Sequence, residues 1–172
     1  MKAVVFSEHG GPNVLHYTDL PEPTLGAKEA LVRVRACALN HLGIWIRRGL
    51  PGVAIALPHV LGSDIGGEVA KTGEGVSTVR AGDRVLLAPR ISCGATTGFE
   101  GAVDIRYLFS RNLSIIGTYM GGKGELFAVL DLVDRGLLKP VIDRVMPLEQ
   151  ATQAHERLEN REHFGKIVLQ IP

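Results

Sequence analysis

The sequence predicts a mainly β fold of the α+β class, with short strands arranged as a barrel or sandwich and helices towards the C-terminal end. The residues before Pro89 contain frequent Gly and Pro and several segments in which apolar and polar residues alternate. Alternation is typical of strands, and Gly and Pro are typical of the turns between them. Beyond Pro89, apolar residues recur at helical spacing, which indicates helices.

The clearest predicted strand covers residues 30–36, where apolar and charged side chains take turns in the run ALVRVRA. A strand with this pattern buries one face and exposes the other. The run LSIIG at 113–117 indicates a buried strand that ends in a glycine turn. Further short strands are expected at 2–6, 14–18, 65–71, 84–88 and 166–170.

Two helices are predicted in the second half of the chain. The first runs from Glu125 to Arg135 and stops at Gly136. Its apolar residues at helical spacing are Leu126, Val129, Leu130 and Val133. The second runs from Leu148 to Glu159, after a proline. Its predicted inner face comprises Ala151, Ala154, His155 and Leu158.

The composition limits the classes of partner. The 172 residues are enough for one compact domain, and 22% charged with 45% hydrophobic residues is ordinary for a globular protein. A net charge of +1 would not attract nucleic acid, and no apolar run approaches the roughly 18 residues that span a bilayer. Cys37 and Cys93 are too few for a disulfide framework. We expect a cytoplasmic protein with no nucleic-acid or membrane partner.

A series of motifs stands in a fixed order along the first half of the chain. They are MKAVV at 1–5, PEP at 21–23, VRVRA at 32–36, NH at 40–41, RRG at 47–49, PHVLGSD at 58–64 and AGDRV at 81–85. In this order they resemble the GroES-like domain of the medium-chain dehydrogenases, which include zinc-type alcohol dehydrogenases and quinone reductases. The resemblance implies a GroES-like, partly open β-barrel with C-terminal helices and a residual Rossmann strand.

The C-terminal part resembles the end of the same family in the runs GATTG at 94–98, LKPVI at 138–142 and FGKIVL at 164–169. The family's intervening segment, which includes most of a Rossmann domain, has no counterpart. No G-x-G-x-x-G motif with an acidic residue about 20 positions later occurs. The resemblance implies one GroES-like domain over 1–172, built from 1–90 and 119–172, with a Rossmann remnant at 91–118. A natural truncation and an engineered deletion both stay open. The direct joining of two family segments favours an engineered deletion.

The resemblance implies hydride transfer between a nicotinamide cofactor and an enone, a quinone or an alcohol–ketone pair. Zinc-dependent members hold the metal with a Cys and a His-Glu pair, where this chain has Asn40 and the pair Ser63 and Asp64. Asn and Ser do not match the thiolate and imidazole that zinc prefers, so no metal is expected. Asn40, His41, Ser63 and Asp64 are the candidate catalytic pocket residues. The alternative is that Asn40 caps a helix and that Ser63 and Asp64 hold a turn.

The resemblance also places Gly94, Ala95, Thr96 and Thr118 beside the nicotinamide end of the cofactor. They would keep only a residual surface, because the segment that holds the pyrophosphate is missing. We therefore expect no bound cofactor and little or no catalysis by this chain alone. The neighbouring Cys93 lacks the three further ligands that a structural zinc needs.

Other interpretations stay open beside a residual enzyme. The chain could be a binding or scaffold module, natural or engineered, with no reaction of its own. Residues 117–124 match a phosphate-loop spacing as far as Lys123, but Gly124 stands where a hydroxyl would hold magnesium. The expected partners are a small-molecule substrate and further copies of the chain, because strand 113–117 would offer an open edge.

Overall fold

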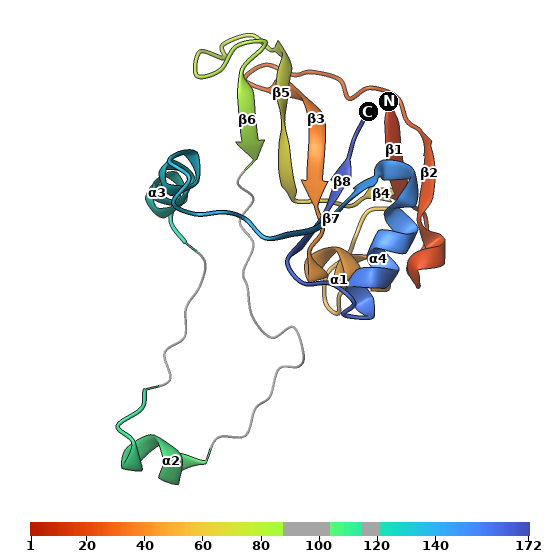
Figure 1. Cartoon of the computed structure of the whole chain (residues 1–172). Helices are drawn as coiled ribbons and strands as arrows, with labels where there is room; N and C mark the ends of the chain where they lie inside the picture. The colour runs from red at the N-terminus through yellow and green to blue at the C-terminus, as the bar shows by residue number, and fades with distance from the viewer. Residues whose placement is uncertain (88–103, 115–120) are drawn as a thin grey trace. The chain divides into compact units, whose positions relative to one another are not determined.

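The computed structural model describes residues 1–87, 104–114 and 121–172, and the chain divides into two compact units (Figure 1). The first unit combines Met1–Pro89 with Pro140–Pro172, and the second comprises Arg90–Lys139. The first unit is therefore built from two stretches that are far apart in the sequence. The single domain predicted over 1–172 stays a prediction.

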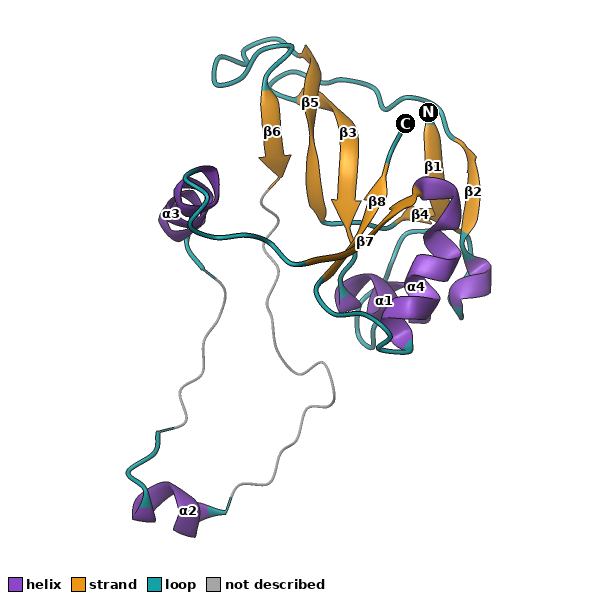
Figure 2. Cartoon of the chain, viewed as in Figure 1, coloured by secondary structure: helices purple, strands orange, loops and turns teal. Residues whose placement is uncertain are grey.

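Two sheets form the first unit (Figure 2). The smaller sheet is antiparallel, with the order β2-β1-β4. Its strands are β1 (Lys2–Phe6), β2 (His16–Asp19) and β4 (His59–Val60). The larger sheet has the order β6-β5-β3-β8-β7 and is antiparallel except for the parallel pair β7 and β8. Its strands are β3 (Ala30–Ala38), β5 (Asp64–Thr72), β6 (Arg84–Leu87), β7 (Ile142–Pro147) and β8 (Lys166–Gln170).

Two helices of the first unit, α1 (His41–Arg48) and α4 (Ala151–Glu159), lie side by side at one end of the sheets (Figure 1). Short 3-10 turns lie at Pro12–Val14, which follows β1, and at Leu148–Gln150, which leads directly into α4. The main core forms where these helices meet the strands. It consists of Leu39, Ile44, Met146, Leu148, Ala151, Ala154, Leu158, Ile167 and Leu169.

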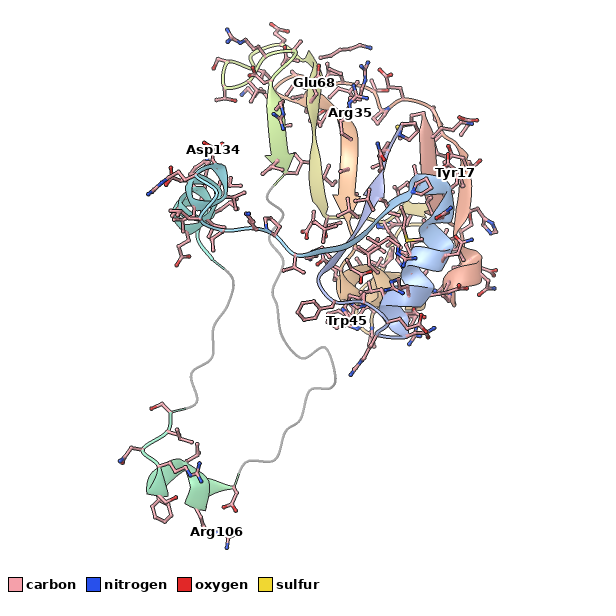
Figure 3. All side chains as sticks on the ribbon, viewed as in Figure 1. Tyr17, Arg35, Trp45, Glu68, Arg106 and Asp134 are labelled. Atoms are coloured by element: carbon pink, nitrogen blue, oxygen red, sulfur yellow. The ribbon has the colours of Figure 1, made fainter. Side chains whose placement is uncertain are left out.

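The second unit has two described helices, α2 (Ile105–Ser110) and α3 (Lys123–Asp134). The Asp104 carboxylate caps α2 by accepting the backbone N–H of Arg106 at 3.0 Å. The Glu125 carboxylate likewise accepts the N–H of Gly122 at the start of α3. These caps satisfy backbone donors that have no partner within a helix. Figure 3 labels Arg106 on α2 and Asp134 at the end of α3.

The mixed α+β class is confirmed, and neither sheet closes into a barrel within the described ranges. The alternation along β3 is also confirmed, because Arg33 and Arg35 are exposed whereas Val34 is half-buried and Cys37 is buried. Arg35 and Glu68 project from neighbouring strands (Figure 3), with the guanidinium 3.9 Å from the carboxylate. The predicted inner face of α4 is confirmed at all four of its positions.

Two predicted strands differ from the structure or fall partly outside it, and one strand of the structure was missed. The strand expected at 14–18 begins only at His16, because Pro12–Val14 forms a 3-10 turn in which Val14 is buried. The edge strand β7 was not predicted. The strand expected at 113–117 extends beyond the described residues at 115–117, and Leu113 and Ser114 belong to no strand. In the described part of the chain, no helix is long and apolar enough to cross a membrane.

Gly165 leads into β8 with a positive φ of 100°, and a Cβ built there would lie 2.5 Å from the carbonyl oxygen of Val141. We expect Gly165→Ala to lower the free energy of unfolding by about 2 kcal/mol, because both the φ and the close contact oppose a side chain. Gly52→Ala is the matched control. Its φ is 77°, but nothing lies within 4 Å of the added Cβ. Equal urea midpoints for the two variants would contradict the expectation.

Candidate functional site

The Lys166 ammonium joins two of the four predicted pocket residues. Its Nζ lies 2.6 Å from Oδ1 of Asn40 and 3.2 Å from Oδ2 of Asp64. Asn40 precedes α1, Asp64 begins β5 and Lys166 begins β8, so three separate elements meet here. An ammonium has three N–H donors, and these two contacts use two of them. The cluster therefore keeps one donor for a further acceptor.

Asn40 stands at the N-cap position of α1, as the capping alternative predicts, but its side chain makes no capping hydrogen bond. Its amide oxygen accepts from Lys166 instead. The usual preference of Asn for this position is a hydrogen bond to the first helical N–H groups. Asn40 therefore occupies the N-cap position without capping the helix, and its side chain contributes to the cluster with Lys166 instead.

His41, the first residue of α1, is half-buried. Burial and the nearby His163, Arg161 and Lys166 lower its pKa below the ordinary value. The neutral imidazole is favoured for the same reason, since a charged ring would lose hydration and would face like charges. His41 stands beside the cluster in sequence, next to Asn40, but none of the described hydrogen bonds joins its side chain to the Lys166 ammonium.

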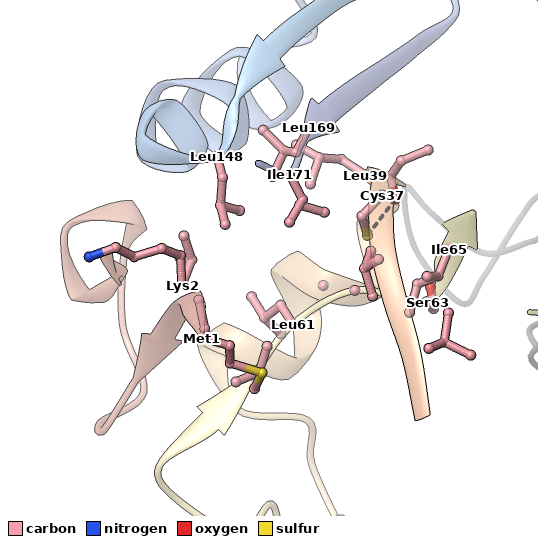
Figure 4. A pocket seen from close by; sticks show the side chains of 18 of the residues that line it. Met1, Lys2, Cys37, Leu39, Leu61, Ser63, Ile65, Leu148, Leu169 and Ile171 are labelled. Carbon is pink, nitrogen blue, oxygen red and sulfur yellow. Dashed lines mark hydrogen bonds between the residues drawn. The ribbon is translucent and has the colours of Figure 1, made fainter. Parts of the chain in front are cut away.

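A cavity of about 650 Å³ lies between the two sheets, and α1 and α4 contribute to its wall at one end. Asn40 and Ser63 both line it, whereas His41 and Asp64 are absent from its wall. Figure 4 shows Leu61, Leu148 and Ile171 directed into the space. A cleft of this size that is lined mainly by apolar side chains is typical of small-molecule sites.

Cys37 lines the same cavity from β3 and is a free, buried thiol. Burial raises its pKa above the ordinary value, so the neutral thiol is favoured. Its Sγ lies close to Gly62, where a built Cβ would be only 2.7 Å away and where φ is 126°. Glycine is thus required at this turn, and the thiol fills the space that a side chain would take.

His155 on α4 is a wall residue that sequence reasoning assigned to packing only. It is 3% exposed, and burial, with the neighbouring Arg47 charge, lowers its pKa to about 4. Its Nδ1 has no hydrogen-bond partner among the described residues. The helical spacing with Ala151 and Leu158 predicted its burial, but no sequence pattern predicted the cavity.

Arg47 lies behind this wall and is fully buried. Its guanidinium pairs with the Glu159 carboxylate of α4 and donates to the carbonyl oxygen of Gly10 at 3.0 Å. A buried charge needs such partners, because burial without them costs several kcal/mol, on the order of 3 to 5. The pair fixes α1 against α4 and so positions the helical end of the cavity.

The predicted cofactor residues Gly94, Ala95, Thr96 and Thr118 lie outside the described residues, as does Cys93. Those four positions stay a prediction. Lys123 and Gly124 of the phosphate-loop alternative begin α3, and the preceding residues 117–120 also lie outside the described ranges.

Zinc does not fit the cluster at Asn40 and Asp64. An amide and a hydroxyl stand where a thiolate and an imidazole would bind a metal best, and the Lys166 ammonium already occupies the space between Asn40 and Asp64. A divalent cation there would be repelled by the ammonium. Among the described residues, no group of three or more His, Cys, Asp or Glu side chains is arranged to hold a metal.

Comparison with known proteins identifies one family. A family model described as zinc-binding dehydrogenase matches residues 54–169. The quinone oxidoreductase of Mus musculus is 36% identical over 115 residues, which make up 66% of this chain and 35% of that protein. The quinone oxidoreductase of Rattus norvegicus is 37% identical over 95 residues, which make up 55% and 29%. The chain thus spans about a third of the length of these relatives.

Solved structures agree in fold. A structure described as an NAD-dependent alcohol dehydrogenase has a TM-score of 0.87 at 24% identity, with 100% of each chain covered. The quinone oxidoreductase from Coxiella burnetii has a TM-score of 0.76 at 18% identity, with 100% of this chain and 99% of that chain covered. At these identities the likeness shows the fold, which combines GroES-like and Rossmann parts in such proteins.

Proposed function

Because this chain belongs to the zinc-binding dehydrogenases of the medium-chain dehydrogenase/reductase family, we propose that it is the substrate-side domain of an NAD(P)-dependent alcohol dehydrogenase or quinone oxidoreductase. It lacks the nucleotide-binding domain and is inactive alone. The observation that carries the substrate-side role is the cluster of Asn40, Asp64 and Lys166 at the helical end of the first unit.

The cluster supports a reaction at a carbonyl group. When the family's nicotinamide cofactor is bound, it supplies a hydride, and negative charge then develops on the carbonyl oxygen of the substrate. The remaining N–H donor of Lys166 would stabilise this charge, while Asn40 and Asp64 hold the ammonium in place. The lowered pKa of His41 keeps a neutral imidazole nearby, which can accept the hydroxyl proton when the reaction runs from alcohol to ketone.

The proposed inactivity follows from the absence of a dinucleotide-binding motif in the sequence. A dinucleotide is held by a strand, a glycine-rich turn and a helix N-terminus, and the sequence has no G-x-G-x-x-G motif in that context. Each lost contact weakens binding by about 1 to 3 kcal/mol. Without a held cofactor, the positioning of hydride donor and acceptor is lost as well.

We expect a turnover below about 1 per second with NADPH or NADH and either a quinone or an enone. A steady-state assay that follows cofactor absorbance is the measurement, with a full-length quinone oxidoreductase as the positive control. Calorimetry should detect no saturable cofactor binding in the micromolar range. Turnover of about 1 per second or above would overturn the proposal. Saturable cofactor binding in the micromolar range would favour a residual enzyme, whereas a cooperative melt with no cofactor binding and no turnover would favour the scaffold role.

We further propose a cytoplasmic protein that assembles into homo-oligomers through residues 113–117. The open edge expected for LSIIG is the reason, because unpaired strand edges associate with each other. Sedimentation velocity at high protein concentration tests the assembly. A single monomer peak would contradict it.

A further inference from the structure

The strand β7 forms one edge of the larger sheet. Among the described strands its only partner is β8, so the other side of its backbone has no strand beside it. The carbonyl oxygen of Val141 accepts the backbone N–H of Lys166, which begins β8, at 2.9 Å. Because backbone groups alternate sides along a strand, the N–H and C=O of Ile142 point away from β8. This edge can therefore form hydrogen bonds with a further strand.

The same edge carries large apolar side chains that remain exposed in the first unit. Ile142 is 47% exposed, and Val145 is 57% exposed. They share one face of the sheet, because their register partners Lys166 and Val168 are two residues apart on β8. Phe164, two residues before Lys166, is 82% exposed. Exposed apolar side chains along an open edge indicate that another surface covers them.

Two charged residues, Asp143 and Arg144, lie in the middle of β7. The Asp143 carboxylate accepts two hydrogen bonds from the Arg157 guanidinium of α4, at 2.9 and 3.3 Å, and one from the backbone N–H of Phe164, at 3.2 Å. A carboxylate has about four acceptor positions, so about one is left. Arg144 is exposed, and its guanidinium makes none of the salt bridges in the described part of the chain. The edge thus presents both a guanidinium and a carboxylate to a partner.

The middle of β7 is complementary to a second copy of itself when the two strands are antiparallel. If Ile142 of one copy stands opposite Val145 of the other, the register along the strand is set. Asp143 of each copy then stands opposite Arg144 of the other. Apolar pairs and opposite-charge pairs on neighbouring strands each stabilise a sheet by about 0.2 to 1 kcal/mol.

Like charges oppose the neighbouring registers. A shift of one residue in one direction places Asp143 opposite Asp143 of the second copy, and a shift in the other direction does the same for Arg144. Parallel strands in register would also bring the like charges together. Like charges directly opposite each other destabilise a sheet. The sequence of β7 therefore favours a single arrangement of two copies.

We propose that two copies of the chain associate through β7, with the two strands antiparallel and Ile142 of each opposite Val145 of the other. The larger sheets then join into one continuous sheet across a twofold axis between Asp143 and Arg144. Each copy covers the apolar edge of the other. One short strand from each copy makes a small contact, so we expect a dissociation constant in the micromolar range. The association does not rest on the oxidoreductase role, and residues 113–117 take no part in it.

A distance between the two copies tests the arrangement directly. Gln170 is exposed at the end of β8 and pairs with Pro147, so it lies outside the contact. With strands about 4.8 Å apart and a rise of about 3.3 Å per residue, the two Gln170 Cα atoms should lie roughly 25 Å apart. We expect nitroxide labels on Gln170→Cys, in a Cys37→Ala and Cys93→Ser background, to give one peak between about 20 and 40 Å by double electron–electron resonance. The absence of a peak at a protein concentration well above the micromolar range would overturn the proposal.

Two variants locate the contact. Val145→Lys places an ammonium on the exposed apolar edge and should weaken the association by at least about tenfold, which corresponds to about 1.4 kcal/mol. Arg144→Glu puts a carboxylate opposite Asp143 of the second copy, and it should also weaken the association about tenfold because each dimer contains two such pairs. Sedimentation equilibrium of the whole chain measures both losses, and the label peak should lose intensity in parallel. A peak that persists unchanged in both variants would show that the copies meet elsewhere, and the proposal would be wrong.

The opposite edge of the same sheet supplies matched controls. Leu86 on β6 is 59% exposed, close to the exposure of Val145, and Arg84 on β6 is also exposed. Leu86→Lys and Arg84→Glu should leave the dissociation constant and the label peak unchanged. An equal loss of association in these variants would mean that any added charge opposes assembly, and it would overturn the role of β7. The turnover assay of the proposed function is independent of this result, since it follows cofactor absorbance.

Discussion

Replacing Glu159 by Gln is expected to lower the free energy of unfolding by about 3 kcal/mol, because the change leaves a buried arginine without its counter-charge. Arg47 is fully buried, and its side chain is held between the Glu159 carboxylate and the Gly10 carbonyl oxygen. The glutamine preserves size and can still accept a hydrogen bond. The loss of unfolding free energy therefore measures the effect of the missing charge and not the effect of a cavity. Urea unfolding followed by circular dichroism is the measurement.

Arg48→Gln is the matched control for this change. The Arg48 guanidinium also reaches Glu159, at 3.2 Å, but its side chain is 60% exposed. An exposed ion pair is worth at most about 1 kcal/mol. Equal losses for the two variants would mean that the buried pair does not differ from a surface contact. A double variant, Arg47→Met with Glu159→Leu, should recover much of the loss, since apolar groups can replace a buried pair.

Acidification is expected to destabilise the first unit through His155. Its pKa is about 4 in the folded chain, against an ordinary value of 6.5. Because the folded pKa is the lower one, folding favours the neutral ring. The resulting stability is fully present above the ordinary value and is lost as the pH falls through the folded pKa. The difference amounts to about 3 kcal/mol.

The measurement is the free energy of unfolding between about pH 7 and about pH 4, compared between the wild type and His155→Phe. The variant should show a much smaller fall over this window. Carboxylates such as Asp143, whose pKa the Arg157 side chain lowers, contribute at the acidic end in both proteins. Their effect cancels in the comparison. Parallel curves for the two proteins would show that His155 is not the titrating group.

Local patterns predicted much of the first unit. The alternation in residues 30–36 places β3 correctly, and the spacing of Ala151, Ala154 and Leu158 identifies the buried face of α4. In both cases the side chains alone determine which face is buried. The strand β7 was missed because Asp143 and Arg144 interrupt its apolar residues, and its pairing with β8 is what makes it a strand. Tertiary context decides such short edge strands.

The candidate site was predicted only in part. The sequence, through its family resemblance, singled out Asn40 and Asp64, but the group that joins them is Lys166, more than a hundred residues away from either. Its position depends on the pairing of β8 with β3, which no local pattern reveals. His155 was recognised as a buried helical residue, whereas its unpaired Nδ1 and the cavity beside it require the assembled sheets.

The strand order has a consequence for synthesis on the ribosome. β3 pairs on one side with β5, which follows it closely, and on the other side with β8, through partners such as Cys37 and Leu169. During translation, one edge of β3 therefore stays bare until nearly all of the first unit has been made. A bare edge can recruit neighbouring nascent chains. Slow elongation or a shortage of chaperones should therefore lower the yield of folded protein. The loss should be larger than for a protein whose strands pair in the order in which they are translated.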